Sequence, residues 1–193
     1  MTEPTTTITD YLLAAECIFF GALLLRNNPL WAISFFVLAV AAAAGGTHHG
    51  FIGSMSAPAA QAVWKVTLYS IGLATLLMLS ATLLAYMPSP WKNIFLAITI
   101  LQFVVYVSIV SFSNDFRYVI YNYVPAMIAI LLMAIFHKNF WLVGAVMISF
   151  AGAAIQRSGV QLHKHFNFND IYHLVQMVAM YFFYRGGKIL QSG

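Results

Sequence analysis

Charged residues are scarce in this chain of 193 residues. They make up 7% of it, against roughly 25% in ordinary soluble domains. Hydrophobic residues make up 62%. A water-soluble surface cannot be built from this composition, because too few polar side chains are present to cover a folded domain. The sequence therefore predicts an integral membrane protein.

Cysteine and clustered basic residues are also lacking. The single cysteine, Cys17, lies inside a hydrophobic run, which excludes a disulfide framework. The net charge of +4 is thinly spread and forms no basic cluster, which excludes nucleic acid as a partner. The opening residues Met1 to Pro4 lack the positive region of a signal peptide, so we expect the first hydrophobic run to be retained as a helix.

Hydrophobic stretches long enough to cross a bilayer recur along the whole chain, since a crossing needs about 20 residues of helix. Short polar turns separate them, and short connections make neighbouring helices antiparallel. We therefore predict an all-α, polytopic membrane protein, in which residues 1–193 form a single domain built as a seven-transmembrane-helix bundle. The predicted helices cover about 8–25, 29–50, 62–87, 91–112, 117–136, 139–157 and 170–187.

The basic residues favour one orientation in the membrane. Seven crossings put the N-terminus on one side, with four basic and four acidic residues, and the C-terminus on the other. The C-terminal side has five basic residues and no acidic one: Arg26, Lys92, Lys138, Arg185 and Lys188. Because cytoplasmic loops are enriched in lysine and arginine, we expect the N-terminus outside. A compact chain with short loops suits a bacterial inner membrane.

The same topology gathers ionisable residues at one end of the bundle. Of the histidines, only His137 falls on the C-terminal side. Polar groups at membrane depth are usually functional. The sequence thus predicts a site near the N-terminal side, among His48, His49, His163, His165, His173, Asp10, Asp115 and Asp170.

Asp170 and His173 are the strongest candidates on the last helix. They are three residues apart, so they share a helix face and can point at one metal ion. The alternative is that Asp170 caps the helix by accepting backbone N–H bonds at its N-terminus.

His48 and His49 end the second predicted helix directly after Gly45-Gly46-Thr47. Small residues let helices approach closely, so this face is expected to point into the bundle. Neighbouring side chains on a helix diverge, so one histidine is the expected inner ligand, with His49 favoured. The alternative is a pair of interfacial histidines in contact with water.

Other polar residues at this end allow two interpretations each. His163 and His165 lie in the loop before the last helix, as solvent-facing residues or, for His165, as a gate or an extra ligand. Glu16 lies inside the first helix, where a carboxylate is costly unless it is paired, protonated or faces a polar cavity. Lys65 and Arg117 are expected to pair with Glu16 or with Asp115.

Seven crossings with a histidine on the second helix and another early on the seventh resemble the CREST superfamily. That group includes alkaline ceramidases and the progestin and adipoQ receptors. The resemblance implies a zinc site inside the bundle and a zinc-bound water that cleaves an amide or ester in a lipid. It maps the second-helix ligand onto His48 or His49.

The seventh-helix histidine pair of that superfamily maps onto Asn169 and His173, so Asp170 is expected to replace the missing first histidine. The serine one turn before the second-helix histidine is replaced by Ala44 or Gly45. The aspartate expected at the start of the third helix has no counterpart.

Three functions follow as hypotheses. The first is a zinc-dependent hydrolase acting on a membrane lipid, with Thr47, Lys65 or Tyr172 stabilising the developing oxyanion. The second is a non-catalytic receptor, sensor or lipid carrier that uses the same cavity. The third is haem ligation between His49 and His173. Retinal binding is disfavoured, because the last helix has no lysine in mid-span.

Overall fold

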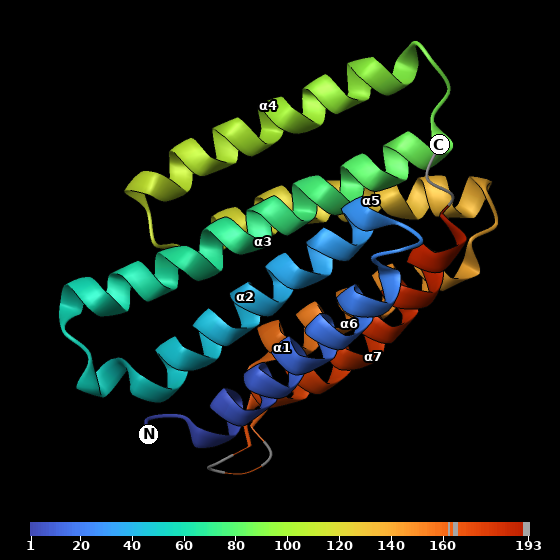
Figure 1. The fold of residues 1–193 in the computed structure, drawn as a ribbon. Helices are drawn as coiled ribbons and strands as arrows, with labels where there is room; N and C mark the ends of the chain where they lie inside the picture. Colours follow the sequence, from blue (N-terminus) through green and yellow to red (C-terminus); the bar gives the residue numbers. More distant parts are fainter. Residues whose placement is uncertain (162, 164–165, 191–193) are drawn as a thin grey trace.

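The computed structural model describes residues 1–161, 163 and 166–190, so His165 lies outside the described residues. Its regular structure is helical, which confirms the all-α class. Seven α-helices and one short 3-10 helix follow each other along the chain (Figure 1). Their bounds are α1 Pro4–Leu24, α2 Pro29–Phe51, η1 Ile52–Ser54, α3 Ala57–Tyr86, α4 Trp91–Phe112, α5 Arg117–Phe136, α6 Phe140–Ser158 and α7 Phe168–Ile189.

These bounds agree closely with the sequence prediction. The ranges 91–112 and 117–136 are those predicted for α4 and α5. α1 and α3 each begin several residues earlier than predicted, with a proline in the first turn, where its missing N–H has no helical partner to lose. Among the described residues, six helices, α1 to α6, are long and apolar enough to cross a membrane.

The helices pack as a ring with one helix outside it. α1 packs against α2 and α7, α2 against α3, α3 against α5, α5 against α6, and α6 against α7. α4 packs only on the outer side, against α3 and α5, and it stands apart from the other helices (Figure 1). The apolar core therefore lies inside the ring, with Trp31, Phe35 and Phe183 among its largest buried side chains.

α1 and α7 run parallel, as expected for two odd-numbered helices of an up-and-down bundle. Three of their contacts keep one register along the seam, with partners 164 positions apart. Thr6 bonds Asp170, Thr9 bonds His173, and the Phe20 ring stacks on Tyr184 with centroids 4.7 Å apart. The start of α7 is thereby held beside the start of α1.

Candidate functional site

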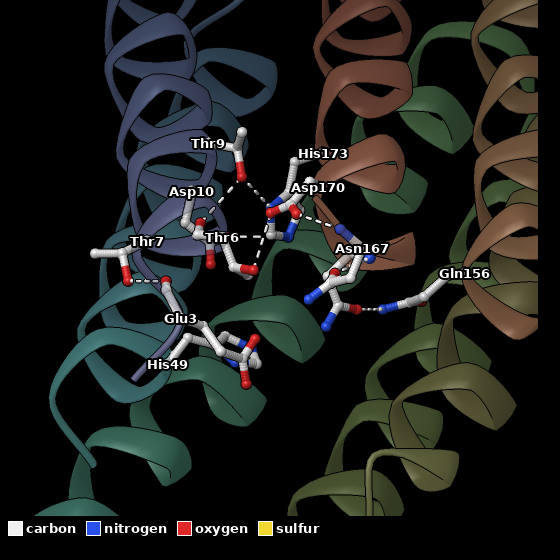
Figure 2. Close-up of polar contacts among 11 residues, drawn as sticks. Glu3, Thr6, Thr7, Thr9, Asp10, His49, Gln156, Asn167, Asp170 and His173 are labelled. Carbon is white, nitrogen blue, oxygen red and sulfur yellow. Dashed lines mark hydrogen bonds and ion pairs between the residues drawn. The ribbon is translucent and has the colours of Figure 1, made fainter. Parts of the chain in front are cut away.

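A carboxylate and an imidazole meet inside the bundle where α1 and α7 begin. Asp10 Oδ1 lies 3.3 Å from His173 Nε2, and the two side chains are only 7% and 9% exposed. Figure 2 shows both residues pointing into the space between the two helices. Thr9, the residue before Asp10 on α1, contacts the other ring nitrogen of His173, with 2.9 Å between Oγ1 and Nδ1.

The hydrogen bonds around His173 define where its protons lie. Thr9 Oγ1 donates to the Thr6 carbonyl at 3.0 Å, so its single proton is committed. His173 Nδ1 must then carry a proton and donate it to Thr9. A lone pair on Nε2 would repel the Asp10 carboxylate, so the pair holds one more proton between Nε2 and Oδ1. Asp10 and His173 are therefore a proton-sharing pair.

Asp170 has a separate set of partners. Its Oδ2 accepts the backbone N–H of Asn167 at 2.6 Å, which forms a capping box at the N-terminus of α7. Its Oδ1 accepts the Thr6 hydroxyl at 2.9 Å. Asp170 is fully buried. The capping interpretation is the one that describes its contacts, and Thr6 adds a bond from α1.

Glycines of α2 allow α1 to come close enough to place Asp10. A Cβ on Gly46 would lie 2.8 Å from the Asp10 Cβ, and one on Gly50 would lie 2.6 Å from Thr7 Oγ1. A Cβ on Gly45 would lie 3.7 Å from Asp10 Oδ2. The expected inward face of α2 therefore packs against α1, and it leaves no room for a side chain at Gly46 and Gly50.

The end of α2 forms an outer layer of the site. His49 Nδ1 lies 3.4 Å from Glu3 Oε2, and these side chains are 26% and 38% exposed. The His48 ring packs on Trp64 at 4.9 Å, and its buried Nδ1 has no hydrogen-bond partner within the described part of the chain. Thr47 donates to the Ala43 carbonyl and accepts from Tyr11, which occupies its hydroxyl on the α1–α2 face.

Of the two cations predicted to pair with Glu16 or Asp115, Arg117 pairs with Asp115 and Lys65 binds backbone carbonyls. The Lys65 ammonium caps the C-terminal end of α4, donating to the carbonyls of Val110 and Ser113. Arg117 donates to Asp115 Oδ2 at 2.7 Å, and this hydrogen bond lowers the pKa of the Asp115 carboxyl. Neither cation is paired with Glu16, and Lys65 is not part of the Asp10–His173 pair.

A zinc ion held by the predicted ligands does not fit this arrangement. Three protein ligands are usual for catalytic zinc. Of the four predicted residues, only His173 belongs to the inner pair, because Asp170 is committed to its cap, His49 faces Glu3 and His48 faces Trp64. Among the described residues, no three His, Cys, Asp or Glu side chains gather as a metal-binding group. We therefore derive no chemical step through a metal.

Comparison with known proteins gives a family without a function. Residues 5–192 match DUF6962, described as a family of unknown function. The chain belongs to the DUF6962 family. No curated protein and no solved structure matches it.

The residue of this DUF6962 chain that sequence reasoning missed as a direct partner is Asp10. Topology placed it at the correct end, but without a partner on another helix. A signal was present: Thr6, Thr9 and Asp10 share one face of the first helix, and Asp10 is one of only five acidic residues in the chain. An acid beside threonines inside an apolar helix is a candidate for an interhelical bond.

Proposed function

We propose that this DUF6962 protein is an integral membrane hydrolase that cleaves the amide or ester bond of a membrane amphiphile at the Asp10–His173 pair. The observation that supports it is the burial of a carboxylate and an imidazole in contact at one end of an apolar bundle. Ionisable pairs at membrane depth are expensive and usually functional. The reaction class is the one that the resemblance to the CREST superfamily implies.

The pair supplies an acid and a base in one place. In the deprotonated pair, Nε2 accepts a proton from a water molecule, whose oxygen forms a bond to the acyl carbon. The bond from that carbon to the leaving nitrogen or oxygen then breaks, and the proton on Nε2 passes to the leaving group. Thr9 fixes the imidazole tautomer, because its hydroxyl oxygen accepts a hydrogen bond from Nδ1–H. The products are a fatty acid and an amine or alcohol.

The amphiphile is expected to reach the pair from the bilayer. Ile8 and Leu12, on the outer face of α1 beside the site, are 55% and 50% exposed and are apolar. The outer Glu3–His49 layer is polar and more exposed than the pair. Tails on the apolar side and a head group on the polar side would place the acyl bond between them.

The proposal includes the number of membrane crossings and the orientation of the chain. We place all seven helices across the membrane, α7 included, because its polar residues Asp170, His173 and Gln176 are turned inward and buried. The N-terminus is then outside and the C-terminus cytoplasmic, in a bacterial inner membrane. A reporter that works only in the cytoplasm should be active when it is fused to the C-terminus. Activity of a C-terminal reporter that works only on the outer face would overturn this orientation.

The test is turnover by purified protein in lipid nanodiscs, presented with ceramides, phospholipids and acylated amines, with products measured by mass spectrometry. Asp10→Asn and His173→Gln should each lower the rate by about 100-fold or more, the usual contribution of acid–base groups. His137→Gln is the matched control, since His137 stacks on Tyr86 at the other end of the bundle. Unchanged rates in the pair variants would refute the assignment.

Elemental analysis of the same preparations tests the metal-free mechanism. One zinc per chain that is lost in Asp10→Asn would make the pair part of a metal centre and would overturn that mechanism.

A second function is favoured by one observation. Both ring nitrogens of His173 and both carboxylate oxygens of Asp170 already have partners within the protein. Such complete pairing is typical of a structural polar network, which suits a non-catalytic receptor or lipid carrier. Stoichiometric binding of an amphiphile without turnover across the panel would establish this alternative.

A further inference from the structure

Glu16 lies on the same seam as the polar contacts of α1 with α7. The residues of α1 that face α7 recur every three or four positions, with Thr6, Thr9 and Phe20 in contact with α7. Glu16 continues this series between Thr9 and Phe20. The seam therefore carries a carboxyl group about 9 Å beyond Asp10 along the helix axis, since a helix rises ~1.5 Å per residue.

Unlike the threonine hydroxyls, one carboxyl oxygen of Glu16 is buried without a hydrogen bond from the described residues. Its Oε2 atom is buried and makes no hydrogen bond to any residue that the structure describes. A buried polar atom without a partner costs free energy, and more so where water is absent. The chain keeps the carboxyl group although a neutral apolar residue would avoid that cost.

The neighbours of Glu16 on the helix surface place it at the edge between protein and lipid. Leu12 and Phe19, one turn before and after it, are 50% and 59% exposed on the outer face. Leu13 and Phe20, on its other side, pack against the core. A molecule in the bilayer can thus approach the carboxyl group sideways, without entering the bundle.

We propose that Glu16 binds a hydroxyl or amide group carried in the hydrocarbon part of the amphiphile, deeper in the bilayer than its head group. A neutral partner is favoured because an ion pair at this depth would remove two charges from water. The inference rests on the proposed function for one point, the placement of the head group at the Asp10–His173 pair. A site at Glu16 would select amphiphiles with a polar substituent in the middle of the hydrocarbon chain.

Dicyclohexylcarbodiimide tests this site directly, because it partitions into hydrocarbon and couples to carboxylic acids there. Purified protein in nanodiscs should be modified at Glu16, as located by peptide mass spectrometry, and Glu16→Gln should remove that modification. Stearamide and its analogue with a mid-chain hydroxyl are matched protecting probes. The hydroxylated amide should slow the modification several-fold more than stearamide does.

Equal protection by the two amides, or no modification of Glu16, overturns the inference. Binding of the two amides to Glu16→Gln and Glu16→Leu gives a second measurement: the preference for the hydroxylated amide should be largest in wild type and lost in Glu16→Leu. Preference without turnover keeps the Glu16 site and refutes the hydrolase. Turnover without preference keeps the hydrolase and refutes the Glu16 site.

Discussion

α7 and α4 differ in which side chains they bury: α7 buries polar residues, whereas α4 leaves apolar residues exposed. α4 buries only Thr99, Tyr106 and Val110, and it leaves a long row of large apolar side chains exposed. α7 buries the polar residues Asp170, His173 and Gln176 together with its apolar ones. α7 is also the helix that is missing from the six identified as long and apolar enough to cross a membrane.

The difference shows that polar side chains lie between the helices of this apolar bundle, while an apolar helix can lie outside it. In lipid, an apolar helix needs no protein neighbour on every side, so α4 can pack on the outside of the ring. Polar side chains need partners from other helices, since the bilayer core offers none. α7, the helix with the weakest membrane signal, accordingly uses the buried side chains of Asp170, His173 and Gln176 to bond α1 and α6. Substitutions should affect the two helices unequally.

The largest effect is expected when one member of the buried pair is removed. Asp10→Ala leaves His173 Nε2 without a partner and should lower the free energy of unfolding by about 3–5 kcal/mol, the cost of breaking a buried pair. SDS titration of the protein in mixed micelles measures it. Arg117→Ala is the control, because its ion pair with Asp115 is exposed and the backbone bond that Asp115 accepts is kept, so we expect no measurable change there.

Substitutions of Asp10 and His173 should have non-additive effects on the free energy of unfolding. In the double variant Asp10→Asn/His173→Gln, the loss should be smaller than the sum of the single losses, because neither group is left facing an unpaired charge. Additive losses would show that the two side chains do not interact.

The helix contact that positions Asp10 should come next in size. Gly46→Ala places a methyl group 2.8 Å from the Asp10 Cβ and 3.2 Å from the Thr7 carbonyl, so α1 must shift. We expect a loss of about 1–3 kcal/mol, typical of overpacking, together with reduced turnover. Gly53→Ala is the matched control, since its nearest side-chain atom is 3.6 Å away. Equal stability of the two variants would contradict the close α1–α2 contact.

Loss of the α7 cap should have a smaller effect. Asp170→Ala removes the acceptor for the Asn167 N–H and for the Thr6 hydroxyl, and should cost about 1–2 kcal/mol. If Asp170 were instead a metal ligand, the variant would lose metal in elemental analysis. Unfolding curves with and without a chelator distinguish the two roles: chelation should leave the wild-type curve unchanged if Asp170 is only a cap.

The smallest effect is expected on α4. Leu101 is 62% exposed, so Leu101→Ala should change the free energy of unfolding by less than about 0.5 kcal/mol. Leu79→Ala on α3 is the matched comparison, because Leu79 is only 5% exposed, and its cost should be several times larger. A large effect of Leu101→Ala would mean that the outer face of α4 has a protein partner.

Much of the fold could be predicted, because the helices and turns are specified by short stretches of sequence. Each helix is long enough to cross a bilayer and is separated from the next by a short polar turn, so the ranges of α4 and α5 were obtained from the sequence. The early starts of α1 and α3 were missed, because threonine, alanine and proline in a first turn do not form a hydrophobic run.

The candidate site was predicted only in part. His173 was assigned to the correct end and helix, but Asp170 was expected beside it as a second ligand, while the structure pairs His173 with Asp10. His49 was expected to face inward, and it contacts Glu3 in the more exposed layer. Each of these differences concerns which way a side chain points around its helix axis.

The sequence by itself determined the axial level of each polar residue. Helix rise is constant, and short turns make successive helices antiparallel, so the start of α1, the end of α2 and the start of α7 had to lie at the same end of the bundle. Only the tertiary structure decided the partners. The rotation of each helix depends on long-range packing, here on Gly46 and Gly50 letting α1 approach α2, and on the contacts between α1 and α7.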